Sequence, residues 1–139
     1  MIREIVKDTN ILQQPSVKVK PSAKETKQVI QDLIDTAEEH KSKCVGLSAI
    51  QIGEPVRVFV AYTGEKFIPF INPVIVQLYG DVYETEEGCM SLDGTRKVKR
   101  YKKVVIMHQK GNKFVKERYS GFYAQIIQHE MAHLSGKLI

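Results

Sequence analysis

The feature that most constrains this chain is a pair of histidines four residues apart near its end, His129 and His133, with Glu130 beside the first. Residues four apart lie on one face of an α-helix, so both imidazoles can bind a single metal ion if this segment is helical. Glu130 can then reach a water molecule on that ion, which is the arrangement that metallohydrolases use. The pattern predicts a metal-binding helix and leaves the third ligand open.

A catalytic metal site needs three protein ligands and one open position. The candidates for the third ligand are Cys89, Cys44, His40, His108 and scattered carboxylates. Cys89 has the best local context, because Gly88 gives the backbone freedom just before it. A Cys-His-His set binds Zn²⁺ well and also suits Fe²⁺. Taken alone, Cys89 is equally consistent with a small buried apolar residue.

The composition is that of an ordinary globular protein, with 42% hydrophobic and 27% charged residues. Its length suits one domain, which we expect to span residues 1–139. No apolar run approaches the ~18 residues of a membrane helix, and charges stand where a signal peptide needs its apolar core. We therefore expect a cytoplasmic protein. The net charge of +5 comes from dispersed lysines, which favours a solvated surface over a DNA-binding patch.

The hydrophobic pattern predicts an α+β fold, with mostly antiparallel sheets packed around the C-terminal metal-binding helix and an N-terminal helix on the outside. Residues 1–20 are expected to form an irregular arm. Ser22 and Glu25 have the spacing of a capping box for the first helix, which should fade over residues 39–43. Its predicted buried stripe consists of Val29, Ile30, Leu33, Ile34 and Ala37.

The middle of the chain predicts strands at residues 57–62, 67–71, 74–79, 104–108 and 114–119. Turn or break signals separate them at Asn72-Pro73 and Gly80-Asp81, and Asp93-Gly94 suggests a hairpin turn. Ser120 is positioned to cap the last helix and Gly136 to end it. Gln51 has two interpretations, a buried amide bonded to the main chain or a neutral donor aimed into a pocket, and the residue alone favours the first.

Three short segments, in order, resemble the motifs of peptide deformylases, and the resemblance covers nearly the whole chain. The first family motif, Gly-x-Gly-x-Ala-Ala-x-Gln, is matched by Cys44-Val-Gly-Leu-Ser-Ala-Ile-Gln51. The second, Glu-Gly-Cys-x-Ser, is matched by Glu87-Gly-Cys-Met-Ser91. The third, Gln-His-Glu-x-Asp-His-Leu, is matched by Gln128-His-Glu-Met-Ala-His-Leu134. Three matches in a fixed order are far more specific than any one of them.

The resemblance implies a role for each matching residue. Cys89, His129 and His133 would bind the metal, and Glu130 would be the general acid/base. The amide of Gln51 and the main-chain N–H of Met90 would hold the developing oxyanion. Family members use one divalent ion, natively Fe²⁺, which Zn²⁺, Ni²⁺ or Co²⁺ can replace. Further candidates for the walls of an apolar substrate pocket are Gly46, Leu47, Tyr123 and Ile126.

The resemblance also implies the reaction. Family members remove the formyl group from the N-terminal formylmethionine of nascent polypeptides and release formate, using a metal-bound water. The implied partners are therefore N-formylated nascent peptides, with at most a weak association with the ribosome. Neither DNA nor a membrane is implied as a partner.

The chain departs from the family pattern at several positions. Cys44 replaces a glycine, Ser48 an alanine, and Asp93 a residue that is proline in many members. The largest departure is Ala132, where the family has an aspartate that we expect to order the surroundings of the ligands, by pairing with the arginine that matches Arg100. We therefore expect a working site that is tuned down or tuned differently. The chain also ends six residues after His133, as a short form would, which weakens any specific claim of ribosome binding.

Two alternatives to an active deformylase stay open from the sequence. A catalytically weakened, deformylase-like binding protein would keep the fold and lose the activity, as the replacements at Ala132, Ser48 and Cys44 allow. A His-Glu-x-x-His metalloprotease would act on internal peptide bonds, but it normally takes a third ligand downstream of the helix, where few residues remain.

Overall fold

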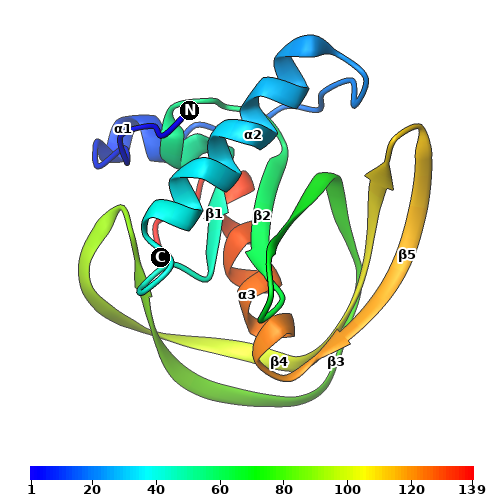
Figure 1. Cartoon of the computed structure of the whole chain (residues 1–139). Helices are drawn as coiled ribbons and strands as arrows, with labels where there is room; N and C mark the ends of the chain where they lie inside the picture. The colour runs from blue at the N-terminus through cyan, green and yellow to red at the C-terminus, as the bar shows by residue number, and fades with distance from the viewer.

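The computed structural model describes residues 1–139 as helices packed on the two faces of a five-stranded sheet (Figure 1). In chain order the elements are α1 (Thr9–Leu12), α2 (Lys24–Glu39), β1 (Gly46–Ser48), the 3₁₀ helix η1 (Ala49–Ile52), β2 (Val58–Tyr62), β3 (Phe67–Cys89), β4 (Leu92–Lys110), β5 (Lys113–Ser120) and α3 (Gly121–Leu134). No helix has the length and apolar character needed to cross a membrane.

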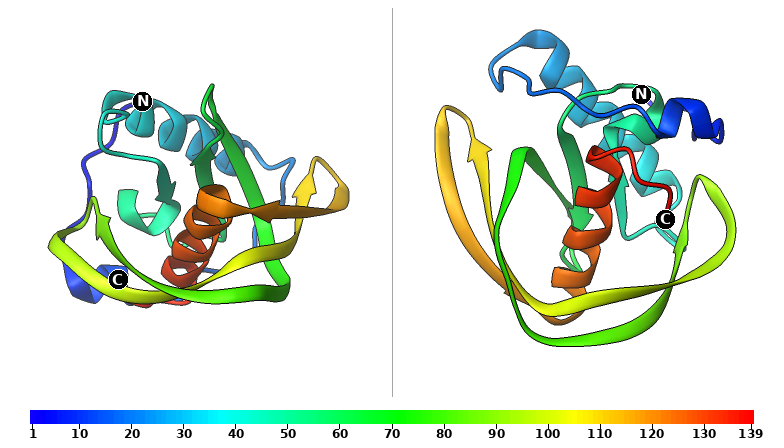
Figure 2. Two further views of the ribbon diagram at one scale, coloured as in Figure 1. Left: turned by 90° about the horizontal axis from the view of Figure 1, so that it is seen from below. Right: turned by 180° about the vertical axis from the view of Figure 1, so that it is seen from behind.

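The sheet follows the chain, with the order β1-β2-β3-β4-β5 and antiparallel pairing at every step. Short connections explain the order from β2 to β5, because antiparallel neighbours can be joined by tight turns. Strand β1 is joined to β2 by a longer segment that contains η1. The long β3–β4 hairpin curves around α3, which both further views also show (Figure 2). The α+β prediction is confirmed, with antiparallel strands around the C-terminal helix.

Strand β2 is buried on both faces, and this places the two main helices on opposite sides of it. Side chains alternate between the faces of a strand. Val58 and Val60 pack in one core cluster with Leu33 of α2, whereas Phe59 packs in a second cluster with Ile127 of α3. The continuous apolar run of β2 thus reflects two hydrophobic layers. One layer packs against α2 and the other against α3.

Helix α2 has the predicted buried stripe but not the predicted cap. Val29, Leu33 and Ala37 are buried, and Ile30 and Ile34 pack at the edge of the same cluster. The capping prediction for Ser22 is wrong, because Ala23 occupies the N-cap position and no side chain caps the helix.

The arm over residues 1–20 is less irregular than predicted, because α1 forms within it. The carboxylate of Asp8 accepts a hydrogen bond of 2.9 Å from the N–H of Asn10 and so caps this short helix. Val17 then makes an isolated parallel bridge with Val56. The sequence offered no apolar periodicity long enough to reveal a single helical turn.

The turn and break signals inside residues 67–89 do not end a strand. Strand β3 runs through Asn72-Pro73 and Gly80-Asp81, and the pairing register with β4 shifts at both places. Asn72 adopts a φ of 48° and Gly80 a φ of 80°, so both lie in the left-handed region. Turn-forming residues here make β-bulges, which bend the hairpin around α3 and keep the strand continuous.

The hairpin turn between β3 and β4 lies earlier than predicted. Cys89 pairs with Leu92, so the turn is made by Met90 and Ser91, and Asp93-Gly94 lies within β4. The prediction at Asp93-Gly94 is therefore wrong by a few residues. The shift matters for function, because it puts Cys89 at the very end of β3.

We expect the double-sided packing of β2 to be the main source of stability for the frame around α3. Phe59 is fully buried and stacks on Phe70 with ring centroids 4.7 Å apart. Phe59→Ala should therefore lower the free energy of unfolding by about 3–5 kcal/mol, measured by urea denaturation. Phe114→Ala removes a ring that is 57% exposed and serves as the control, with an expected change below about 0.5 kcal/mol. Equal effects of the two substitutions would contradict this account of the core.

Candidate metal centre

Helix α3 brings His129 and His133 to one place. The two residues are one helical turn apart on a face that packs against the sheet, and both side chains are buried. Their Nε2 atoms are 3.2 Å apart, and their rings are nearly perpendicular, with centroids 4.9 Å apart. The helix thus aims two ring nitrogens at a single point, as the sequence predicted.

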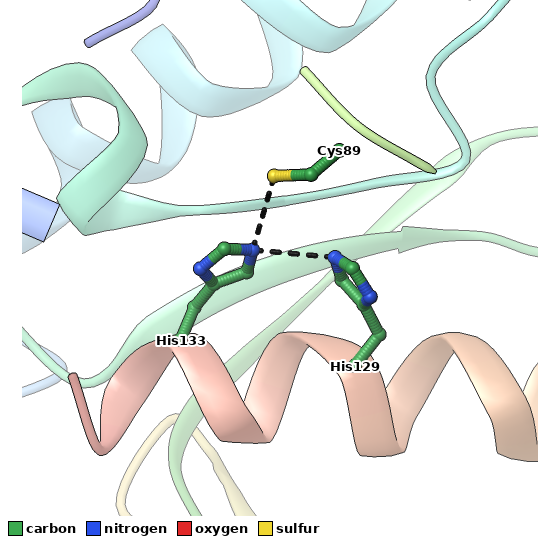
Figure 3. Close-up of side chains that lie close together, drawn as sticks. All are labelled: Cys89, His129 and His133. Carbon is green, nitrogen blue, oxygen red and sulfur yellow. Dashed lines mark hydrogen bonds between the residues drawn. The ribbon is translucent and has the colours of Figure 1, made fainter. Parts of the chain in front are cut away.

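The third member of the site comes from the tip of the long hairpin. Cys89 ends β3, and its Sγ lies 3.4 Å from the Nε2 of His133 (Figure 3). The three ligand atoms lie within 4.8 Å of one another, although the thiol and the second imidazole are 44 residues apart in the chain. The structure therefore assembles a Cys-His-His cluster.

The cluster has the dimensions and the chemistry of a metal centre. Ligand atoms about 2.0–2.3 Å from one tetrahedral ion lie about 3.3–3.6 Å from each other. The separations of 3.4 Å and 3.2 Å on the two sides of His133 Nε2 match that spacing. Thiolate and imidazole are ligands for Zn²⁺ and for Fe²⁺. The cluster can accordingly hold one metal ion, and its donor set does not by itself choose between metals.

Glu87 fixes the orientation of His129. Its Oε1 lies 2.7 Å from the Nδ1 of His129, and Arg100 donates two hydrogen bonds of 2.7 Å and 2.9 Å to the same carboxylate. Burial raises the pKa of Glu87, but the bonds from His129 and Arg100 outweigh burial and hold the pKa at about 2. The ionised carboxylate accepts the Nδ1 proton, which leaves the Nε2 of His129 available for a metal.

The two histidines differ in their preference for a proton. Burial, together with the positive charges of His129 and Arg100, lowers the pKa of His133 to about 3, so its ring is neutral and ready to bind a metal. Burial also lowers the pKa of His129, but its contacts with Cys89 and Glu87 and the charge of Glu130 dominate and raise it to about 10. Of the two rings, that of His129 has the stronger preference for a proton in this environment.

Glu130 lies beside this cluster with its carboxylate buried. Only 3% of the residue is exposed, and this burial raises the pKa of its carboxyl. Ser48 donates a 2.8 Å hydrogen bond to its Oε1. A general base that must also act as an acid near neutral pH needs a raised pKa.

Gln51 satisfies both interpretations that the sequence left open. Its Oε1 accepts a 3.0 Å hydrogen bond from the main-chain N–H of Ser48, which fixes the orientation of the amide. Its Nε2 then points toward the cluster, 3.4 Å from the Sγ of Cys89 and 3.2 Å from the Oγ of Ser91. The main-chain contact thus aims the N–H donors at the metal centre.

A cleft of about 1440 Å³ opens beside the cluster. Gly46, Met90 and Ile126 line it, as do Cys89, His129, Glu130 and Gln51. Two predicted wall residues lie elsewhere. Leu47 is fully buried in the core cluster against α2, because its side chain points to the opposite face of β1 from Gly46. Tyr123 packs on Phe70 and Tyr119.

The other candidate ligands stay outside the cluster. His108 is buried on β4 and is hydrogen-bonded to Glu117. His40 follows α2 at the rim of the cleft. Cys44 is buried, and its thiol donates a hydrogen bond to the carbonyl of Gly46. Burial and the negative charge of Glu130 raise the pKa of Cys44 to about 12, so its thiol is un-ionised.

No role was predicted from the sequence for Glu87, Ser91 or Ser48. A signal for Glu87 was present, since it stands two residues before Cys89 on β3, and residues two apart on a strand share a face. Ser91 lies in the turn after Cys89, where strand alternation does not apply. No local signal linked Ser48 to Glu130, because the two residues are 82 positions apart.

Comparisons with known proteins agree on one family. The model of the polypeptide deformylase family matches residues 2–139. A peptide deformylase of Clostridium beijerinckii is 44% identical over 140 residues, which cover all of both chains. The crystal structure of a peptide deformylase from Thermotoga maritima superposes with a TM-score of 0.90 at 28% identity, covering 99% of this chain and 95% of that one. The crystal structure of an actinonin-bound peptide deformylase from Acinetobacter baumannii superposes with a TM-score of 0.90 at 25% identity, covering 99% of this chain and 95% of that one.

We expect Glu87 to control how tightly the cluster binds a metal. Glu87→Gln keeps the shape of the side chain but removes the charge that faces His129 and Arg100. The affinity for a divalent ion should fall about 10–100-fold, measured by competition with a chelator. Glu86→Gln is the matched control, because the neighbouring carboxylate is exposed and the same charge is lost. Equal affinities in the two variants would show that Glu87 does not support the ligands.

Proposed function

This chain belongs to the polypeptide deformylase family, and from that premise we propose that it removes the N-formyl group from the formylmethionine of newly made polypeptides. The observation that carries the proposal is the convergence of Cys89, His129 and His133 next to the buried carboxylate of Glu130. Water adds to the formyl carbon and the C–N bond breaks, so the products are formate and a free amino terminus.

Cys89, His129 and His133 would hold one divalent ion, and we propose Fe²⁺ as the metal in the cell, with Zn²⁺, Ni²⁺ or Co²⁺ as possible replacements. A bound ion supplies Lewis acidity, which makes water a nucleophile near neutral pH and polarises a carbonyl oxygen. The ionised Glu87 supports this role by keeping a proton on the Nδ1 of His129.

Glu130 is the residue that we propose for moving protons. Its carboxylate takes a proton from the attacking water and later delivers it to the departing nitrogen, which leaves as an amine. The burial that raises its pKa supports both halves of this transfer, because a carboxyl that is too acidic would not keep the proton long enough to return it.

Gln51 and Met90 are proposed to stabilise the oxygen that gains charge when water attacks. The amide of Gln51 is held by the main chain of Ser48, so its donors are fixed before the reaction begins. The main-chain N–H of Met90, in the turn after Cys89, would be the second donor. A neutral amide also has the advantage that it neither titrates nor repels a cation.

The cleft supports a peptide as the substrate. It runs past the cluster toward the N-terminal arm, and Gly46 and Ile126 line it close to Glu130. We propose that these two residues contact the methionine side chain. Because such substrates leave the ribosome in the cytoplasm, the proposal implies reaction there and only a weak, transient encounter with the ribosome.

Release of formate from formyl-Met-Ala-Ser tests the proposed function directly. We expect turnover after loading with Fe²⁺ under anaerobic conditions, or with Ni²⁺, and none after the metal is removed. Glu130→Gln should lower kcat by about 10²–10⁴-fold while the metal content stays the same, because only proton transfer is lost. Glu84→Gln, an exposed carboxylate on β3, is the control.

Two other results would reject the proposal. Cleavage of unformylated peptides at internal bonds would identify a metalloprotease. Tight binding of the formylated peptide without any release of formate would identify a binding protein that has kept the fold.

Ala132 provides a separate test of how the site is tuned, since the family motif has an aspartate there. We expect Ala132→Asp to raise metal affinity or turnover by about 10–100-fold, because the loss of a residue that supports metal ligands typically costs that much. Ala132→Asn is the matched control for size without charge. If metal content and turnover are the same in Ala132→Asp and in the parent, the replacement has no effect on tuning.

A further inference from the structure

The side chain of Ser48 makes a contact that the family motif does not provide for, since that motif has an alanine at this position. Ser48 is fully buried at the end of β1, and its Oγ lies 2.8 Å from the Oε1 of Glu130. The same Oγ lies 3.2 Å from the main-chain carbonyl oxygen of Glu130. One hydroxyl thus faces two different acceptors of a single residue.

This double contact ties the hydroxyl to both the side chain and the main chain of Glu130. A hydroxyl has one proton to donate and two lone pairs that accept. The shorter contact is the hydrogen bond that Ser48 donates to the carboxylate Oε1. The longer contact keeps the same Oγ beside the main-chain carbonyl of Glu130. One side chain of β1 thus links the carboxylate to the backbone that carries it.

The opposite side of the carboxylate is also closed by β1. A Cβ atom built on Gly46 would lie 2.6 Å from the Oε2 of Glu130 and 2.9 Å from the Cγ2 of Ile126, so the glycine leaves just enough room for the carboxylate. Gly46 and Ser48 are two residues apart on one strand and therefore share a face. Together they form a cradle that permits little movement of the Glu130 side chain.

We propose that Ser48 is a positioning residue that holds the carboxylate of Glu130 in one place beside the metal cluster. This inference rests on the proposed function for the role of Glu130. Ser48 touches neither the substrate nor the metal ligands in this account. Its side chain also forms a capping box with Gln51 at the start of η1, so the order of the Glu130 side chain is the readout specific to the contact with Glu130. An unpaired, buried acceptor is unfavourable, so losing the hydroxyl should let the carboxylate turn away.

The main test compares Ser48→Ala with the parent protein, both loaded with the same metal. We expect kcat for formyl-Met-Ala-Ser to fall about tenfold, which is the size of one lost hydrogen bond, while KM and metal content change less than twofold. Ser48→Thr keeps the hydroxyl and should restore most of the activity. If the extra methyl prevents folding, Ser48→Cys, a weaker donor of similar size, should fall between serine and alanine.

A second readout does not depend on activity. Crystals of the metal-free Ser48→Ala variant should show the Glu130 side chain in more than one rotamer, whereas the parent shows one. Ser16→Ala is the control, because Ser16 is also buried but its hydroxyl has no partner. It should change neither kcat nor the order of Glu130.

The outcomes separate the two claims. If the parent releases formate and Ser48→Ala is equally fast with an equally ordered Glu130, the inference about Ser48 is wrong and the proposed function stands. If the parent releases no formate, the proposed function fails, and with it the catalytic part of this inference. The crystals would still decide whether the hydroxyl fixes the carboxylate.

Discussion

The contact between the tip of the β3–β4 hairpin and one face of α3 is the interaction on which the rest of the site depends. It brings the thiol of Cys89 to 3.4 Å from the Nε2 of His133, and no metal could bind to three protein ligands without it. The hairpin reaches this point because bulges at Asn72 and Gly80 bend it around the helix. At both places, residue types that usually end a strand form a bulge instead, and the strand continues.

The frame behind this contact is stiff because β2 is buried on both faces. One layer of side chains packs toward α2 and the other toward α3, so the helix that carries the histidines cannot shift without disturbing a core cluster. Stiffness matters for chemistry, since metal ligands and proton-transfer groups act only when they are held close to their working geometry.

The electrostatics of the site follow from burial combined with a few specific partners. Arg100 and His129 keep Glu87 ionised, and Glu87 in turn directs the ring of His129. Glu130 has no cation hydrogen-bonded to it, so burial dominates and raises its pKa. Two carboxylates near one cluster thus acquire different chemical roles because only one of them is paired with an arginine.

Hydrophobic periodicity and the motifs were sufficient to predict the α+β class, both long helices, the last hairpin and the residues of the metal cluster. These depend on local patterns such as the stripe of α2 and the spacing of His129 and His133. Predictions at Ser22, Asn72-Pro73 and Asp93-Gly94 failed, because turn and cap residues are also used at bulges and beside element ends.

The amino-acid sequence by itself determined which groups can bind a metal and move protons, since these depend on residue type and on spacing along the chain. Only the tertiary structure decided what each of those groups touches. The pairing of Glu87 with His129, the aim of Gln51 and the hydroxyl of Ser48 against Glu130 all join residues from distant segments. Such contacts arise from how the sheet bends around α3. Turn residues at Asn72 and Gly80 produce that bend, but their local pattern does not specify which distant side chains then meet.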